Sequence, residues 1–381
     1  LKVTSEKLWK FICLFALMKK LFQIFIVLCL TSCANIVAPT GGEKDINAPK
    51  LQKTNSTENL QHIHKKIVSF DFDEFIVLNN WEENFYISPP VNKRIQKKIK
   101  GTELFLTIED TLAENATYNL ALNSCIKDLN EGNILDTLNY IFSTSDVLDT
   151  LTLSGKLQDA YTLEQIENAW IMLFEENKND SVIFKENPNY IAKTDKEGNF
   201  HFPNLNAKNY KVVALTEFDF IYNEDESIAY LDSSINAETD SFFNLFSFNP
   251  IIEIDSTNSD TTGIKTDSLS SDSLLIDTLT KEKISYGKLE IISSTTTPCI
   301  FQLLQNKKVV KEFSFTNPPY ILDELIAGKY QLKYISDLNK DRKWTTGSWT
   351  NKVQAEKAQN YPSEITIRSN WDLELEWLIV D

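Results

Sequence analysis

Short runs in which every second residue is apolar fill the sequence from Lys66 onward, and this period of two constrains the fold more than any other feature. A period of two is typical of β-strands with one buried face, whereas amphipathic helices repeat every 3.6 residues. Turn residues such as Ser88-Pro89-Pro90 separate the runs at the spacing of an antiparallel sandwich. We therefore predict an all-β fold. The first runs are Val68, Phe70, Phe72; Leu104, Leu106, Ile108; Tyr118, Leu120, Leu122; and Leu138, Tyr140, Phe142.

The composition limits the function. The 381 residues include 38 Lys and Arg against 54 Asp and Glu, for a net charge of -16, which opposes phosphate neutralisation and therefore nucleic-acid binding. Three His leave little room for imidazole catalysis. The nucleophile-elbow, zinc-protease, phosphate-loop and Cys-x-x-Cys motifs are not found in the sequence. We predict that the protein is not an enzyme and needs no organic cofactor.

The N-terminal region has the order of a secretory signal: Met18-Lys19-Lys20, an apolar run over residues 21–30, then Thr31-Ser32-Cys33. About ten apolar residues cover roughly half of a ~30 Å hydrocarbon core. The run Leu30-Thr31-Ser32-Cys33 resembles the lipobox of bacterial lipoproteins, which implies cleavage before Cys33 and a lipid on its sulfur. The alternative is an uncleaved anchor with an incidental Cys. Residues 1–17 make no sense as part of a signal, and we interpret them as an over-extended reading frame.

Changes in composition divide the chain into segments. A stretch rich in Ser, Thr and Asp without aromatic residues cannot bury enough apolar surface to offset ordering entropy, and it is predicted to be a flexible linker. The apolar run before it, Ser241 to Pro250, is predicted to form an edge strand. The predicted segments are a signal peptide at 1–32, a tether at 33–47, sandwiches at 48–147 and 148–252, the linker at 253–283 and a third sandwich at 284–381.

The first sandwich resembles the bacterial Ig-like domain of the S-layer protein SbsA type. The resemblance depends on an ordered set of residues, and one departure from it is a missing proline-glycine turn near residues 55–59, which leaves the register of the first strand open. The matching residues are Ala48-Pro49-Lys50-Leu51, Phe70 and Glu74, Leu112 with Thr117-Tyr118, Lys127-Asp128 with Gly132-Asn133, and Tyr140 to Thr144.

The second sandwich resembles the carboxypeptidase-regulatory, transthyretin-like fold, through a turn built on Asp195 and Gly198 that leads into a strand with Phe200 and Phe202. That resemblance implies a spacer or a binding appendage without catalytic residues. The apolar pattern of the second sandwich recurs 120 residues later in the third, which indicates an internal repeat. The repeated pairs are Leu205 and Leu325, Ala207 and Ala327, Tyr210 and Tyr330, and Val212 and Leu332.

Two cysteines remain after the predicted cleavage and lipidation, Cys125 and Cys299. A single disulfide between them is one interpretation. We favour two separate buried thiols, one in each of two domains.

A candidate Ca²⁺ site lies at Asp337, Asn339 and Asp341, because oxygen ligands at positions 1, 3 and 5 of a loop suit a hard cation. Arg342 stands where such loops have Gly, and no Glu stands at position 12, so a polar loop without metal is the alternative. A second candidate, the pair His62 and His64, has no third ligand, and a solvent-facing pair is the simpler interpretation.

Trp344 and Trp349 form a candidate binding site, because aromatic rings on a sandwich loop can stack against sugars. The alternative is that they fill a core. The leading hypothesis is a non-enzymatic, lipid-anchored scaffold or interaction protein of the cell envelope. We expect it on the outer membrane, facing the periplasm rather than the cell surface. Its expected partners are the membrane, through the lipid on Cys33, and an envelope protein or glycan. The alternative function is a glycan-binding accessory lipoprotein that uses Trp344 and Trp349.

Overall fold

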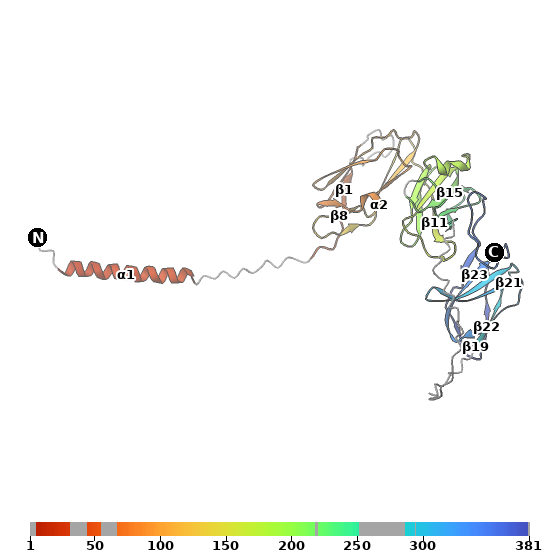
Figure 1. Cartoon of the computed structure of the whole chain (residues 1–381). Coiled ribbons are helices and arrows are strands. Elements are labelled where there is room, and N and C mark those ends of the chain that lie inside the picture. Colours follow the sequence, from red (N-terminus) through yellow and green to blue (C-terminus); the bar gives the residue numbers. More distant parts are fainter. Residues whose placement is uncertain are drawn as a thin grey trace, which may run out of the picture. The chain divides into compact units, whose positions relative to one another are not determined.

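The computed structural model describes residues 5–30, 44–54, 67–217, 220–250, 286–293 and 295–379 (Figure 1). The chain divides into two parts, Leu1–Asn47 and Ala48–Asp381. The predicted lipidation site Cys33, the pair His62 and His64, and the predicted linker lie outside the described residues.

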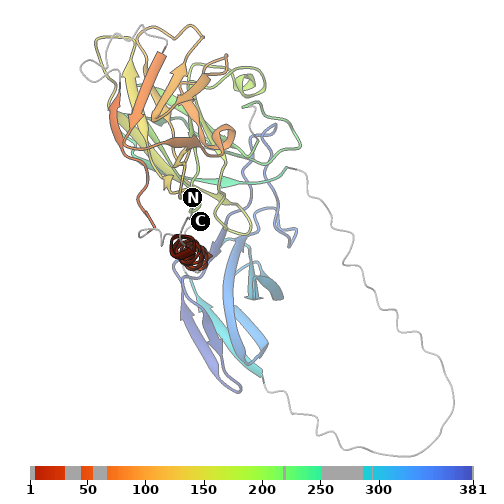
Figure 2. The same cartoon turned by 90° about the vertical axis from the view of Figure 1, so that its left-hand side faces the viewer.

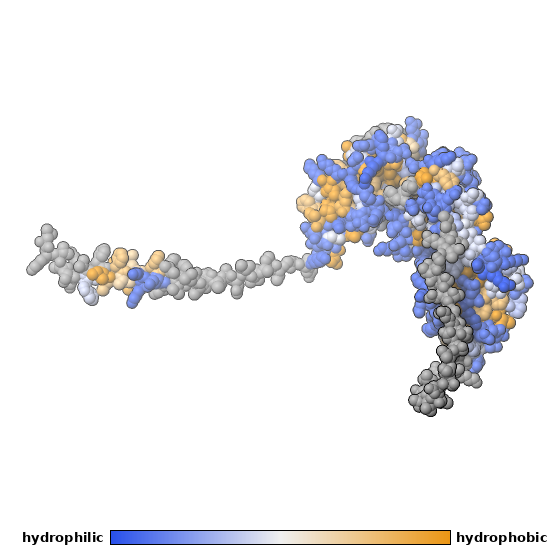
Figure 3. Space-filling view, in the orientation of Figure 1, coloured by the Kyte–Doolittle hydropathy of each residue, from blue (hydrophilic) through white to orange (hydrophobic). Residues whose placement is uncertain are grey.

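The first part contains one helix, α1, at Ser5–Leu30 among its described residues. Apolar side chains, orange in Figure 3, lie beside hydrophilic ones in blue on this helix. No helix within the ranges given above combines the length and the hydrophobicity that crossing a membrane requires.

The second part is built of mainly antiparallel sheets with only short helices between the strands, which confirms the predicted all-β fold. Its first sandwich has the sheets β1-β2-β6-β5, β10-β7-β4 and β3-β8-β9 around one core. The elements are β1 Leu51–Thr54, β2 Ile67–Phe72, β3 Ile76–Leu78, α2 Trp81–Asn84, β4 Tyr86–Ser88, β5 Gln96–Lys100, β6 Glu103–Thr107, β7 Thr117–Ala121, β8 Ile126–Asp128, β9 Ile134–Leu135 and β10 Asn139–Ser143.

The predicted alternation holds in β2, where Val68, Phe70 and Phe72 are buried and the residues between them are not. It is wrong for β7, in which all five residues are buried. The second face of β7 is covered because β14 of the next sandwich lies against it. The open register of the first strand resolves into a bulge between Leu51 and Lys53 in the pairing of β1 with β2.

The turn between β8 and β9 is closed by Asp128, one of the residues that carry the Ig-like resemblance. Its Oδ1 accepts hydrogen bonds from the backbone N–H groups of Glu131 at 2.6 Å and Gly132 at 2.8 Å, and its Oδ2 accepts one from Asn133 at 2.9 Å. Burial alone would raise the pKa of Asp128, but these backbone donors outweigh it, and the net pKa is lowered.

The second sandwich has a sheet β14-β11-β18 facing a sheet β13-β12-β15-β16, with β17 paired to β15. The predicted edge strand is confirmed, because β18 is the outermost strand of its sheet and pairs in parallel with β11. The elements are β11 Leu151–Asp159, β12 Trp170–Glu175, a short 3₁₀ helix Asp180–Phe184, β13 Tyr190–Lys193, β14 Asn199–Leu205, β15 Asn209–Leu215, β16 Ile228–Tyr230, β17 Ile235–Asn236 and β18 Phe242–Ser247.

The third sandwich repeats this topology strand for strand, with sheets β22-β19-β26 and β21-β20-β23-β24 and β25 paired to β23. Figure 2 shows its strands side by side in cyan and blue. Its elements are β19 Tyr286–Ile292, β20 Cys299–Gln305, β21 Lys308–Phe315, β22 Tyr320–Ile326, β23 Gly328–Ser336, β24 Ala358–Asn360, β25 Ile365–Ile367 and β26 Asp372–Glu376.

The repeat extends to individual hydrogen bonds. Tyr210 donates its hydroxyl to the carbonyl of Asn206 at 3.2 Å, and Tyr330 donates to the carbonyl of Ile326 at 2.8 Å, four residues back in each case. The internal repeat read from the sequence is thereby confirmed.

The cysteines occupy separate cores. Cys125 lies in the core of the first sandwich and Cys299 in that of the third, and both are free thiols. The prediction of two buried thiols is confirmed, and a bridge between them is excluded. Burial raises the pKa of Cys125 to about 12, so its sulfur stays protonated and unreactive.

Candidate functional site

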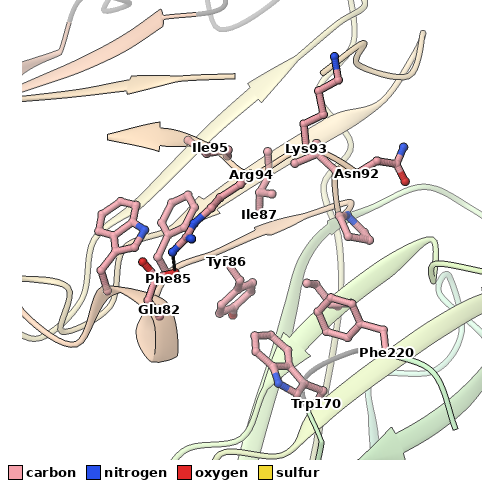
Figure 4. A pocket seen from close by; sticks show the side chains of 14 residues that line it. Glu82, Phe85, Tyr86, Ile87, Asn92, Lys93, Arg94, Ile95, Trp170 and Phe220 are labelled. Atoms are coloured by element: carbon pink, nitrogen blue, oxygen red, sulfur yellow. Dashed lines mark ion pairs between the residues drawn. The ribbon is translucent and has the colours of Figure 1, made fainter. Parts of the chain in front are cut away.

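A cavity of about 440 Å³ opens beside the short helix α2 (Figure 4). Trp81, Phe85, Tyr86 and the loop that follows line it from the first sandwich, and Trp170, Ile191 and Phe220 line it from the second. Its walls are therefore contributed by segments that are distant in sequence.

The aromatic rings that line this cavity contact one another. Trp81 and Phe85 stack with ring centres 4.2 Å apart, as expected for aromatic residues at i and i+4 of one helical turn. Tyr86 meets Trp170 edge-to-face at 5.4 Å, and Trp170 meets Phe220 in the same way at 5.1 Å. Of these contacts, the one between Tyr86 and Trp170 joins the first sandwich to the second.

The charged groups at the rim form ion pairs. Arg94 and Lys97 both bind the carboxylate of Glu82, the lysine at 2.6 Å; the dashed line in Figure 4 marks the arginine pair. Hydrogen bonds from Lys97 and then Arg94 lower the pKa of Glu82, which keeps it ionised near neutral pH. Burial raises the pKa of Tyr86 to about 12. Neither group is suited to exchange protons near pH 7.

The candidate glycan residues lie at the junction between the second and third sandwiches. Trp349 is 8% exposed and belongs to a cluster with Trp170, Tyr230 and Phe248 of the second sandwich. Its ring meets Tyr230 edge-to-face at 4.9 Å, and the Lys352 ammonium lies 2.9 Å from its ring centre. The ring of Trp349 is therefore already contacted by two residues of the same chain, Tyr230 and Lys352.

Trp344 is partly buried at the same junction. Its indole N–H donates to the backbone oxygen of Glu356 at 2.9 Å, and its ring lies 5.1 Å from that of Tyr161 in the second sandwich. Sugar stacking needs an open aromatic face, and the structure gives these two rings neighbours from the protein instead. Glycan binding through Trp344 and Trp349 stays a prediction that the geometry does not favour.

Polar groups complete this junction. Lys333, 4% exposed, donates to the carbonyl oxygen of Tyr161 at 2.8 Å and stands 4.5 Å above the centre of its ring. Burial lowers the pKa of Lys333. Gln354 donates to the carbonyl of Tyr230 at 3.1 Å, and Gly347 lies so close to Phe248 that a Cβ there would stand 2.5 Å from its ring. These contacts join the two sandwiches beside a cavity of about 250 Å³, which Tyr230 and Gln354 also line.

The residues of the candidate Ca²⁺ site begin the long loop between β23 and β24, at 337–357. Asp337 is 3% exposed, whereas Asn339 and Asp341 are exposed. Burial raises the pKa of Glu356, near the end of this loop, and the charge of Asp337 adds to the shift. Within the described part of the chain, no three or more His, Cys, Asp and Glu side chains gather as a metal site. A metal here would also need the amide of Asn339 or backbone oxygens.

Sequence reasoning missed the cavity, although the cluster of Trp81, Phe85 and Tyr86 was visible as a local signal. Trp371 is 59% exposed on the third sandwich, whereas Trp349, one of the two tryptophans predicted for binding, is 8% exposed. The type of a loop residue alone does not give its exposure, because contacts from the neighbouring sandwich decide it.

The fold defines a chain of β-sandwich modules with mainly antiparallel strands. The first of these modules matches a known family: residues 45–144 match the model described as a bacterial Ig-like domain. No curated protein matches the chain.

Several solved structures resemble the chain weakly. The Bacillus anthracis TIE protein has 13% identity and a TM-score of 0.18 over 90% of this chain and 59% of its own. GBS52, the minor pilin of Streptococcus agalactiae, has 13% identity and a TM-score of 0.19, over 60% of this chain and 95% of its own. The N-terminal part of the bacterial S-layer protein SbsC has 13% identity and a TM-score of 0.19, over 53% and 44%.

Proposed function

We propose that the protein is a non-enzymatic scaffold of the cell envelope, attached to the outer membrane by a lipid on Cys33 and facing the periplasm. In this role the sandwiches act as one stiff arm that displays an interaction surface away from the membrane. The observation that carries the proposal is the set of aromatic and polar contacts at the junction around Trp349, because neighbouring domains move relative to one another unless their interface is extensive and apolar.

The junction of the first and second sandwiches supports the same role. The Tyr86 and Trp170 rings meet there, and the backbone N–H of Ile191 donates to the hydroxyl of Ser88 at 3.0 Å. Ser88 is 6% exposed, so this hydrogen bond is shielded from water. Such contacts favour a fixed angle between the modules over a flexible hinge.

The chemistry of the cavity supports a role without catalysis. Glu82 is neutralised by Lys97 and Arg94, and the hydroxyl of Tyr86 is buried with a raised pKa. General acid–base catalysis requires a group poised near the working pH, and nucleophilic catalysis requires a base beside the nucleophile. The residues that line the cavity supply aromatic contacts and one ion-paired carboxylate.

We also propose that the repeated modules β11–β18 and β19–β26 are carboxypeptidase-regulatory, transthyretin-like sandwiches. The turn before β14 supports this assignment: Asp195 Oδ1 accepts backbone N–H groups from Glu197 at 3.0 Å and Asn199 at 2.7 Å, and Gly198 has a positive φ of 75°. Phe200 and Phe202, which follow the turn, are buried as the resemblance implies. These modules serve as spacers in the proposed scaffold.

The anchor is tested by comparing two cysteines of the same segment, Cys33→Ala and Cys29→Ala. Cells expressing each full-length variant are labelled with an alkyne fatty acid and fractionated, and the mature N-terminus is identified by mass spectrometry. We expect a lipidated N-terminal Cys33 in the wild type and in Cys29→Ala, and loss of label and of outer-membrane retention in Cys33→Ala. Retention and labelling that survive Cys33→Ala would contradict the lipid anchor.

A further inference from the structure

Two edge strands of the protein carry opposite charges. The strand β5 is the outermost strand of its sheet in the first sandwich, and β26 is the outermost strand of its sheet in the third. Among the residues that the structure describes, no strand pairs with the second edge of either. Such an edge presents unpaired backbone N–H and C=O groups, to which another extended segment can bind.

The strand β5 belongs to a basic segment. Residues 93–100 contain five Lys and Arg and no Asp or Glu, in a chain whose net charge is -16. Lys98 and Lys100 are exposed on one face of β5, and the ion pairs described for this sandwich involve neither of them. Across the sheet, Lys98 stands opposite the apolar Phe105 of β6, and Lys100 stands opposite Glu103. Lys98 is therefore an exposed cation with no acid on the strand beside it.

The strand β26 has the complementary charge. Its exposed residues Asp372, Glu374 and Glu376 alternate with half-buried leucines. Glu374 stands directly opposite Glu290 of the neighbouring strand β19, and like charges in that position repel each other. The ion pairs described for the third sandwich involve neither carboxylate. A cation that approached Glu374 from the second edge of β26 would offset this repulsion.

The two strands also match in length and pattern. Each has five residues, and in each the exposed side chains alternate with half-buried ones. If Lys98 stands opposite Glu374, then Lys100 stands opposite Asp372 in an antiparallel pair and opposite Glu376 in a parallel pair. Either direction therefore sets two lysines against two carboxylates.

The charges select between the possible pairings of these edges. Charged residues on an edge strand ordinarily prevent association with another strand. Pairing of β5 with a second β5, or of β26 with a second β26, is opposed in this way because like charges would meet. Pairing of β5 with β26 is the combination in which the charges attract. Figure 1 shows the second sandwich between the first and the third, so this pairing joins different copies of the chain.

We propose that β5 of one copy pairs with β26 of a second copy, so that the protein associates head to tail. The partner of each edge is another molecule of this chain. Because the two surfaces differ, every copy offers one of each, and the contact repeats from molecule to molecule. This association goes beyond the proposed scaffold role and does not depend on a lipid at Cys33.

The test measures association of the purified full chain by sedimentation velocity in detergent, over a series of protein concentrations at low and at high salt. We expect the sedimentation coefficient to rise with concentration, and to rise less at high salt because salt screens exposed charges. Lys98→Glu and Glu374→Lys should each weaken association by about 10-fold, since like charges would then stand opposite each other. A wild-type chain that stays monomeric at every concentration would overturn the proposal.

Exchange of the two charges separates pairing from folding. The combined variant Lys98→Glu/Glu374→Lys restores opposite charges across the contact, and so does a mixture of the two single variants. We expect both to associate nearly as strongly as the wild type. The matched control is Lys53→Glu, which reverses an exposed lysine on β1, the opposite edge strand of the same sheet, and should leave association unchanged. Equal weakening by Lys98→Glu and Lys53→Glu, or a combined variant that associates no better than the single ones, would also overturn the pairing.

Discussion

Truncation of Trp349 to Ala should weaken the second sandwich even though Trp349 belongs to the third. The side chain is 8% exposed and lies in a cluster with Trp170, Tyr230 and Phe248. A large aromatic side chain buries about 150–250 Å², which at ~25 cal/mol per Å² corresponds to about 4–6 kcal/mol. Residual compactness of the unfolded chain reduces this figure, so we expect a loss of about 3–5 kcal/mol.

The matched control is Trp371→Ala, which removes the same side chain from an exposed position in the same sandwich. We expect a change within about 0.5 kcal/mol for this variant. Urea unfolding of the full chain is followed by far-UV circular dichroism near 215 nm, where the β-sheet backbone dominates the signal, and the midpoints of the transitions are compared. Trp349 couples the second and third sandwiches, so we expect them to unfold in one shared transition in the wild type. Its removal should separate this transition into two.

Equal midpoints for Trp349→Ala and Trp371→Ala would refute this reasoning. Such a result would mean that the contact with Tyr230 contributes no stability and that the two sandwiches unfold independently. The proposed stiff arm would then lack its main support.

Three further predictions concern the individual cores. The lowered pKa of Asp128 means that its stabilisation is fully present above its unfolded value of 3.8 and is lost as pH falls through the lower native pKa, so Asp128→Asn should flatten the acid limb of a stability–pH curve. Cys125 and Cys299 should resist a thiol reagent in the folded protein and react once urea unfolds it; prompt labelling at neutral pH would contradict their burial. Gly155→Ala should cost about 1–3 kcal/mol, because its Cβ would collide with the ring of Phe200, and an unchanged melting temperature would count against that clash.

The sequence predicted the features that depend on local pattern. Alternation located β2 because only one of its faces is covered, and Asp128 with Gly132 located a turn because all of its hydrogen bonds lie within five residues. The internal repeat could be predicted because Tyr210 and Tyr330 occupy equivalent positions, and each donates its hydroxyl to the carbonyl oxygen four residues back. In each case the neighbours that decide the structure are close in sequence or repeated.

Features that depend on contacts between modules were not predictable in this way. The alternation of β7 gave no sign of its buried second face, because β14 covers it. Trp349 lies in a polar loop, where the sequence alone predicts a binding residue, whereas its partner Tyr230 comes from another sandwich. The cavity beside Trp81 is likewise assembled from two modules. The local pattern of a single sequence does not show which residues of different modules come into contact.

The pairing of β11 with β18, and of β19 with β26, has a mechanical consequence. Each pair joins the first and last strands of a module in parallel, from Ser154 opposite Phe242 to Asp159 opposite Ser247, and from Lys288 opposite Asp372 to Ile292 opposite Glu376. A pull on the two ends of such a module slides these strands along each other. Their backbone hydrogen bonds then share the load in shear and do not open one after another like a zipper. Tension along the chain is thus resisted by many bonds at once.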